Sequence, residues 1–125
     1  MSYVDNFVLA VPAANRDAYL RHAREAATVF HDHGALRVVE TWGDDVPEGK
    51  LTDFHRAVAL EPGETVVVGW IEWPGKDVRD AGWKAIMADP RMAPDRNPMP
   101  FDGKRMIHGG FETLLDARVG AGAPA

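Results

Sequence analysis

Three side chains that can exchange protons fall on predicted strands of this 125-residue chain: Glu40, Glu72 and His108. A histidine exchanges a proton close to neutral pH, and a carboxylate beside it can orient the ring or set its charge. Such a group is able to move a proton on a small substrate. If the protein carries out chemistry, we expect these three residues to be its catalytic group, with His108 as the general acid or base.

Large apolar residues share the strand registers of the three polar ones. Side chains alternate between the two faces of a strand, so residues two positions apart point the same way. Tryptophans on the same side as a carboxylate would exclude water from a bound ligand. The apolar residues that we expect to line a ligand site in this way are Trp42, Trp70 and Met106.

A structural interpretation competes with the catalytic one, and we favour it. His108 and a glutamate can form a polar bridge across a dimer interface, because structural ion pairs perturb pKa values as active sites do. Gly109 and Gly110, which follow His108 in the sequence, agree with both interpretations. They either bulge the strand and turn His108 inward, or they let a helix or a tryptophan pack closely against it.

The sequence predicts neither a metal site nor an organic cofactor. His31 and His33 are two positions apart, so on a helix their side chains point in nearly opposed directions. The acidic turn at 43–50 lacks the spacing of a calcium-binding EF-hand loop. The chain has no cysteine, which excludes disulfides, thiolate zinc sites, iron–sulfur clusters and cysteine nucleophiles.

Charge and hydropathy disfavour nucleic-acid and membrane partners. The formal net charge is −5, and no apolar run approaches the roughly 20 residues that span a bilayer. The first residues do not form a signal peptide, so we expect a cytoplasmic protein. Basic residues around Phe101 offer the one region where RNA binding could be argued, but "KRMIHGGFE" does not match the signature of RNA-binding strands.

Hydrophobic periodicity predicts the elements that position these residues. Helical stripes of apolar residues cover 15–33 and 76–89. Residues 52–60 fit either a short helix or a strand, and we favour the helix. The proline-rich segment 90–100 is expected to be an irregular loop. The predicted strands are 4–11, 36–42, 64–73 and 104–114.

This order of elements predicts an α+β ferredoxin-like fold, the split βαβ plan, with a four-stranded antiparallel sheet. One domain would occupy 1–116, followed by a disordered tail at 117–125. Both long helices would cover one face of the sheet and leave the other bare. If the registers described above lie on that bare face, its tryptophans require a ligand or a second subunit. We therefore expect a face-to-face homodimer whose sheets enclose a cavity.

Several long motifs resemble a known family. They are "SYVDNFV", "HGALRVVETWGDDVP", "VVVGWIEWPGKDVRD", and "DPRM" followed by "MPFDGKRMIHGGFE". Together they resemble the DUF1428 or YbaA-like family of uncharacterised bacterial proteins, in the dimeric α+β barrel superfamily. The resemblance implies a ferredoxin-like protomer that dimerises through its sheet. It implies no catalytic residues, because superfamily relatives range from cofactor-free monooxygenases to haem-degrading enzymes and isomerases.

The expected function is therefore a homodimer that binds a small, partly apolar organic molecule in a sheet-lined cavity. Cofactor-free acid–base or oxygenase-type chemistry on that molecule is one form of this hypothesis. A non-enzymatic binding or structural dimer is the alternative, and RNA association ranks third.

Overall fold

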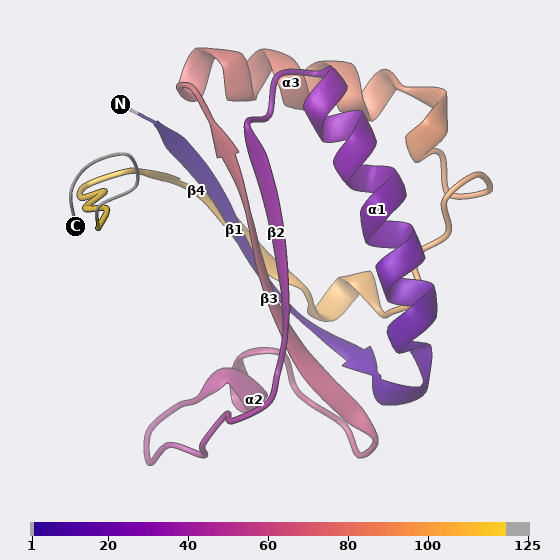
Figure 1. The fold of residues 1–125 in the computed structure, drawn as a ribbon. Coiled ribbons are helices and arrows are strands. Elements are labelled where there is room, and N and C mark those ends of the chain that lie inside the picture. The colour runs from indigo at the N-terminus through magenta and orange to yellow at the C-terminus, as the bar shows by residue number, and fades with distance from the viewer. Residues whose placement is uncertain (1, 120–125) are drawn as a thin grey trace.

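Four antiparallel strands form a single sheet in this computed structural model, which describes residues 2–119 (Figure 1). The order of strands across the sheet is β2-β3-β1-β4, so the first and third strands are central. This is the strand order of the predicted split βαβ fold, which is confirmed. The strands are β1 (Tyr3–Pro12), β2 (Arg37–Trp42), β3 (Glu64–Trp73) and β4 (Ile107–Glu112).

Two long helices lie on the same face of the sheet, and the opposite face carries neither (Figure 1). They are α1 (Arg16–Asp32) and α3 (Lys76–Ala88), while the short helix α2 (Phe54–Ala57) lies in the long connection between β2 and β3. The favoured prediction of a helix within 52–60 is thus confirmed. Three 3₁₀ turns complete the elements: η1 (Ala13–Asn15), η2 (Pro90–Met92) and η3 (Gly103–Arg105).

The helix α1 forms because its apolar residues repeat with helical period and bury one stripe against the sheet. It ends before Gly34, whose φ of 109° belongs to the left-handed region that glycine adopts readily. The buried residues of the stripe are Tyr19, Ala23, Ala26, Val29 and Phe30. The predicted helix at 15–33 is therefore correct to within one residue at either end.

The last strand is shorter than predicted. Residues 104 and 105 lie in the turn η3, where the Asp102 carboxylate accepts a hydrogen bond from the Lys104 amide at 3.0 Å. An aspartate that caps a turn in this way competes with an extended conformation. Residues 113–119 have no regular secondary structure, and residues 120–125 of the predicted disordered tail lie outside the described part of the chain.

The pairing of β4 with β1 is regular, one residue opposite one residue from Ile107 to Glu112. The two glycines of β4 therefore do not form a bulge, and that half of the expectation was wrong. Gly110 lies opposite Asp5 on the helix side of the sheet, where a β-carbon would meet the Tyr3 hydroxyl at 2.5 Å. The other half expected a helix or a tryptophan to pack closely, and at Gly110 it is the helix α3 that does so, through Arg79 at 2.8 Å from the same β-carbon.

Within residues 2–119, no helix is long and apolar enough to cross a membrane.

Candidate functional site

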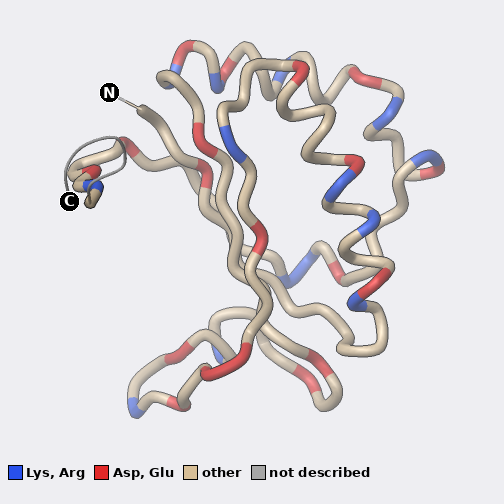
Figure 2. The backbone as a smooth tube through the Cα atoms, in the orientation of Figure 1, with Lys and Arg blue, Asp and Glu red and all other residues tan. Residues whose placement is uncertain are grey.

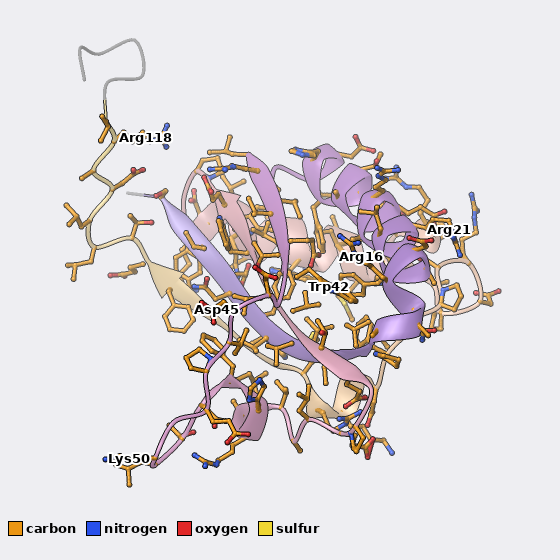
Figure 3. All side chains as sticks on the ribbon, turned by 60° about the horizontal axis from the view of Figure 1, so that its bottom comes forward. Arg16, Arg21, Trp42, Asp45, Lys50 and Arg118 are labelled. Atoms are coloured by element: carbon orange, nitrogen blue, oxygen red, sulfur yellow. The ribbon has the colours of Figure 1, made fainter. Side chains whose placement is uncertain are left out.

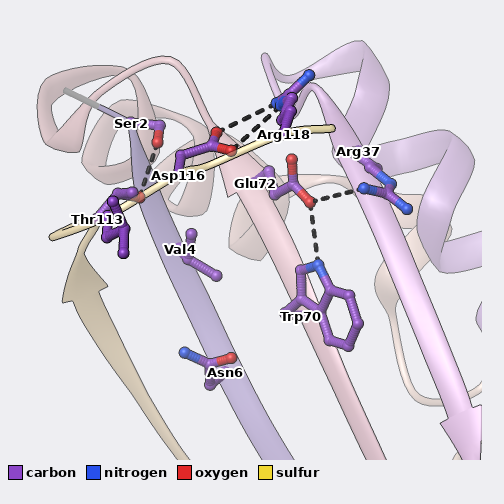
Figure 4. A pocket seen from close by; sticks show the side chains of 10 residues that line it. Ser2, Val4, Asn6, Arg37, Trp70, Glu72, Thr113, Asp116 and Arg118 are labelled. Carbon is purple, nitrogen blue, oxygen red and sulfur yellow. Dashed lines mark hydrogen bonds and ion pairs between the residues drawn. The ribbon is translucent and has the colours of Figure 1, made fainter. Parts of the chain in front are cut away.

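Trp70 and Glu72 lie on the sheet face that is turned away from the helices. Their neighbours in β3, Ile71 and Trp73, are buried in the core beneath α1, so alternation places Trp70 and Glu72 on the opposite side. The Trp70 indole Nε1 donates a hydrogen bond to Glu72 Oε2 at 3.0 Å. Arg37 on the neighbouring strand donates to the same oxygen at 3.4 Å (Figure 4). The structure thus joins two of the predicted residues in one polar group on the bare face.

A cavity of about 500 Å³ lies beside this group, between the bare face and the C-terminal segment 113–118 (Figure 4). The segment is attached to the sheet at its start, because Ser2 Oγ donates to Thr113 Oγ1 at 2.7 Å. Its far end carries a pair between Arg118 and Asp116 at 3.2 Å. The lining residues are Ser2, Val4, Asn6, Arg37, Trp70, Glu72, Thr113, Leu115, Asp116 and Arg118.

Glu40 and Trp42 lie on the helix side, which corrects their predicted place on the bare face. Glu40 pairs with Gly69, and Trp42 pairs with Val67, a member of the buried core under α1. The error is a shift of one residue in the assumed register, which moves every side chain of a strand to the other face. The sequence of β2 permits both registers, because Val38 and Val39 offer an apolar residue to each face.

The environment of Glu40 is half-buried and hydrogen-bonded. The Tyr19 hydroxyl on α1 donates to Glu40 Oε1 at 2.6 Å. Burial raises the pKa of the Glu40 carboxyl, and the hydrogen bond from Tyr19 opposes that shift only in part. Burial and the nearby carboxylate raise the pKa of Tyr19 in turn. The guanidinium of Arg16 lies 5.6 Å from the centre of the Trp42 ring. Figure 3 labels both residues.

His108 and Met106 also belong to the helix-side register, which corrects the prediction for them. His108 pairs with Phe7 of β1 and is exposed on the edge strand. Met106 packs against the core cluster that contains Leu9 and Val67. No hydrogen bond or ion pair within the described residues joins His108 to Glu40 or Glu72. The structure therefore brings the predicted Trp70 and Glu72 together and leaves the other four predicted residues apart from them.

A buried carboxylate that was not among the predicted site residues, Asp5, lies on the central strand β1. Its Oδ2 accepts hydrogen bonds from the indoles of Trp73 at 2.9 Å and Trp83 at 2.8 Å. Its Oδ1 accepts from Arg79 Nη2 at 2.7 Å, and that guanidinium lies 5.2 Å from the centre of the Tyr3 ring. Every oxygen of Asp5 is thus occupied by the protein. This group holds α3 against the sheet and leaves no lone pair directed at a substrate.

The signal for Asp5 was present in the sequence. An aspartate in the middle of an apolar strand must find hydrogen-bond donors when the strand is central. The sequence alone does not identify those donors, because Trp73, Arg79 and Trp83 follow Asp5 by about 70 residues or more.

No group of three or more histidine, aspartate or glutamate side chains is placed to hold a metal ion in the part of the chain that the structure describes.

Comparisons with known proteins agree with this architecture. The family model described as "Protein of unknown function (DUF1428)" matches residues 2–103. The sequence is 57% identical over 116 residues to the uncharacterized protein YbaA of Escherichia coli K12, which covers 93% of this chain and 99% of YbaA. YbaA of Shigella flexneri matches with the same values.

Among solved structures, one similar chain is a variant of SnoaB, a cofactor-independent oxygenase from Streptomyces nogalater. The TM-score is 0.50 at 18% sequence identity, and the match covers 92% of this chain and 93% of the SnoaB chain. A likeness at this identity shows the fold alone, and it confirms the fold class expected from the sequence.

Proposed function

This chain belongs to the DUF1428 family of proteins of unknown function, and we propose that it is a homodimer which binds a small, partly apolar organic molecule at the bare face of its sheet. The observation that carries the proposal is the cavity beside Trp70 and Glu72, which only one sheet face and a thin C-terminal segment enclose. A second subunit on that face would close it.

The bare face supports dimerisation because large apolar side chains are exposed on its edge strand β4. Ile107 and Phe111 are exposed, although both belong to the regular pairing of β4 with β1. The connection that contains α2 covers one end of the same face, where Val58 packs on Ala10 and Val66. Large apolar side chains that stay exposed on a sheet face are typical of an interaction surface.

Two segments project from the side of the sheet that the long helices leave bare. Figure 1 shows the C-terminal segment at one end of the bare face and the connection around α2 at the other. Both carry large apolar side chains that contact almost nothing in their own chain: Leu114 is 94% exposed, Leu115 is 82% exposed and Leu51 is 96% exposed. Their burial against a partner subunit would recover about 1.5–3 kcal/mol for each side chain.

The cavity has the size of a small-molecule site, and its lining mixes apolar with polar side chains. Its volume of about 500 Å³ accommodates a small organic ligand. Val4, Leu115 and the Trp70 ring provide apolar contacts, while Asn6 and Arg37 provide polar ones. A ligand with an apolar body and one or two polar groups fits this combination.

Binding without catalysis is the form that the geometry favours. Glu72 Oε2 already accepts hydrogen bonds from Trp70 and Arg37. His108, the expected acid or base, lies on the other side of the sheet. SnoaB is an oxygenase on a similar fold, but a fold does not carry an activity with it. If acid–base chemistry occurs, Glu40 is the better candidate because burial already favours its protonated form.

Native mass spectrometry and analytical ultracentrifugation of the purified protein test the proposal together. We expect a dimer at micromolar concentration and an added mass that is lost on denaturation. Phe111→Asp combined with Ile107→Asp should yield monomers, while Leu20→Asp, on the exposed side of α1, should leave the dimer intact. A wild-type monomer at micromolar concentration would overturn the dimer.

The ligand site has a separate test. Titration with the fluorescent probe 8-anilinonaphthalene-1-sulfonate should show saturable binding to the wild-type protein. Trp70→Ala should weaken that binding by about tenfold, and Trp42→Ala, on the other face, should not. Equal affinities for the wild type and Trp70→Ala would remove the cavity as a ligand site.

A further inference from the structure

A second constellation surrounds Asn97, far from the bare sheet face. Among the described residues, Asp5 and Asn97 are the buried polar side chains, each 6% exposed. Asp5 is satisfied by the tryptophans and arginine described above. Asn97 lies in the proline-rich loop, and its Oδ1 accepts a hydrogen bond from His22 Nδ1 on α1 at 2.9 Å. Its Nδ2 donates to the His22 carbonyl at 3.4 Å, which fixes the orientation of the amide.

The hydrogen bond to Asn97 determines which nitrogen of the His22 ring carries a proton. Because an amide oxygen only accepts, His22 Nδ1 carries a proton and Nε2 is the remaining nitrogen. Phe101 packs edge-on against the ring, with 5.8 Å between centroids. A buried asparagine that holds one histidine at both its side chain and its backbone is a device for orienting that side chain.

His22 lines a cavity of about 250 Å³ between α1 and the loop that contains Asn97. Arg21 and Arg96 line it from the two sides, and Pro98 and Met99 form an apolar wall. In Figure 2 the helix and the loop lie next to each other on the helix side of the sheet, and Figure 3 shows Arg21 and Arg16 on opposite flanks of α1.

The two arginines of this cavity are free to bind a ligand. Most arginines in the described chain form ion pairs with carboxylates; those that do not are Arg16, Arg21, Arg24 and Arg96. Arg16 lies over the Trp42 ring, and Arg24 is outside the cavity. Arg21 and Arg96 thus bring two guanidinium groups, neither in an ion pair within the described residues, to one concave site of a chain whose net charge is −5.

We propose that this cavity binds a small molecule that carries one oxyanion group, a carboxylate or a phosphate monoester. Arg21 and Arg96 hold the oxyanion, since a guanidinium matches two of its oxygens at once. Because Nδ1 already donates to Asn97, His22 Nε2 donates to the oxyanion in the doubly protonated form of the ring, and Pro98 and Met99 contact the short apolar part. Glu25 also lines the cavity and keeps its net charge low, which disfavours polyanions such as nucleic acid.

The test titrates the protein with inorganic phosphate and, separately, with butyrate, followed by amide chemical shifts at constant ionic strength. We expect saturable shifts in α1 and the 96–100 loop with one probe at least, and the tighter of the two identifies the oxyanion. Arg21→Gln and Arg96→Gln should each weaken binding by about tenfold. Arg24→Gln is the matched control, because it removes the same charge from the same helix outside the cavity.

His22→Gln examines the remaining contact. It should weaken binding several-fold, and far-UV circular dichroism reports whether the helix remains intact. Shifts that grow linearly with the concentration of both probes would overturn the proposal. So would an equal loss of affinity in Arg24→Gln, because the effect would then be general screening of charge. The oligomeric state does not enter this test, so its result is independent of the dimer proposed above.

Discussion

Tyr3 occupies the space that a side chain at position 110 would need. A β-carbon on Gly110 would lie 2.5 Å from the Tyr3 hydroxyl and 2.8 Å from Arg79 Nη2. Tyr3 is buried on the first strand, and Arg79 stacks on its ring while binding Asp5. The glycine on the edge strand is therefore part of the group that fixes α3 to the sheet.

Gly110→Ala should destabilise the fold. The added methyl group must displace Tyr3 or Arg79, and overpacking of this kind costs about 1–3 kcal/mol. Gly109→Ala is the control, because its β-carbon would face the other side and approach Phe111 no closer than 3.5 Å. Urea denaturation of both variants measures the difference. Equal midpoints for the two variants would contradict this account of the glycine pair.

Asp5→Ala should be the most destabilising single change at this group. It leaves Arg79 without its buried partner and removes the acceptor of the Trp73 and Trp83 indoles. Breaking a buried ion pair from one side costs about 3–5 kcal/mol. Asp80→Ala is the comparison, because Arg79 also contacts that exposed carboxylate. The free energy of unfolding should fall much less in Asp80→Ala, and comparable losses would show that Asp5 is not central.

Glu40→Gln should change the dependence of stability on pH. Burial raises the pKa of Glu40 above its ordinary value of 4.5, so the folded state keeps a proton that the unfolded state has released. The wild-type protein therefore loses stability as the pH rises from about 4.5 through the raised pKa. Glutamine keeps an acceptor for the Tyr19 hydroxyl and does not titrate.

The measurement is the free energy of unfolding of both proteins between pH 4 and pH 7. The advantage of Glu40→Gln over the wild type should grow across this range, while all other titrating groups cancel in the difference. If the difference between the two free energies of unfolding stays constant, or grows in favour of the wild type, ionisation of Glu40 does not destabilise the folded protein.

The fold was predictable because each element has a local cause in the sequence. The strand at 64–73 was predicted at its observed bounds, since Pro74 and Gly75 follow its apolar run directly. Gly34 and Pro90 lie just beyond the two long helices. These signals act over a few residues and need no knowledge of the tertiary structure.

The candidate site was predictable only in part, because a face assignment depends on partners that are distant in the sequence. Trp70 and Glu72 were placed on the bare face correctly, and alternation along β3 sets them opposite the core residues Ile71 and Trp73. In β2 both registers offer an apolar side chain, and Glu40 was assigned to the wrong one. His22 and Asn97 form a pair across 75 residues, which neither periodicity nor ligand spacing reveals.

Removal of residues 115–125 should leave the free energy of unfolding of the protomer almost unchanged, although it alters the cavity on the bare face. The side chains of Leu115 and Val119 are more than four-fifths exposed, and within residues 2–119 Arg118 forms its ion pair with the neighbouring Asp116 alone. The protomer therefore gains little from the described part of this segment. The free energy of unfolding of the monomer, extrapolated to zero urea, should stay within about 0.5 kcal/mol of the full-length value.

The dimer and the ligand should respond to the same truncation. Leu115, Asp116 and Arg118 form one wall of the 500 Å³ cavity, so affinity for 8-anilinonaphthalene-1-sulfonate should fall. If the segment packs on a partner subunit, the dimer dissociation constant from sedimentation equilibrium should rise by tenfold or more, which corresponds to about 1.4 kcal/mol. An unchanged dissociation constant with weaker probe binding would restrict the role of the segment to the cavity of its own protomer.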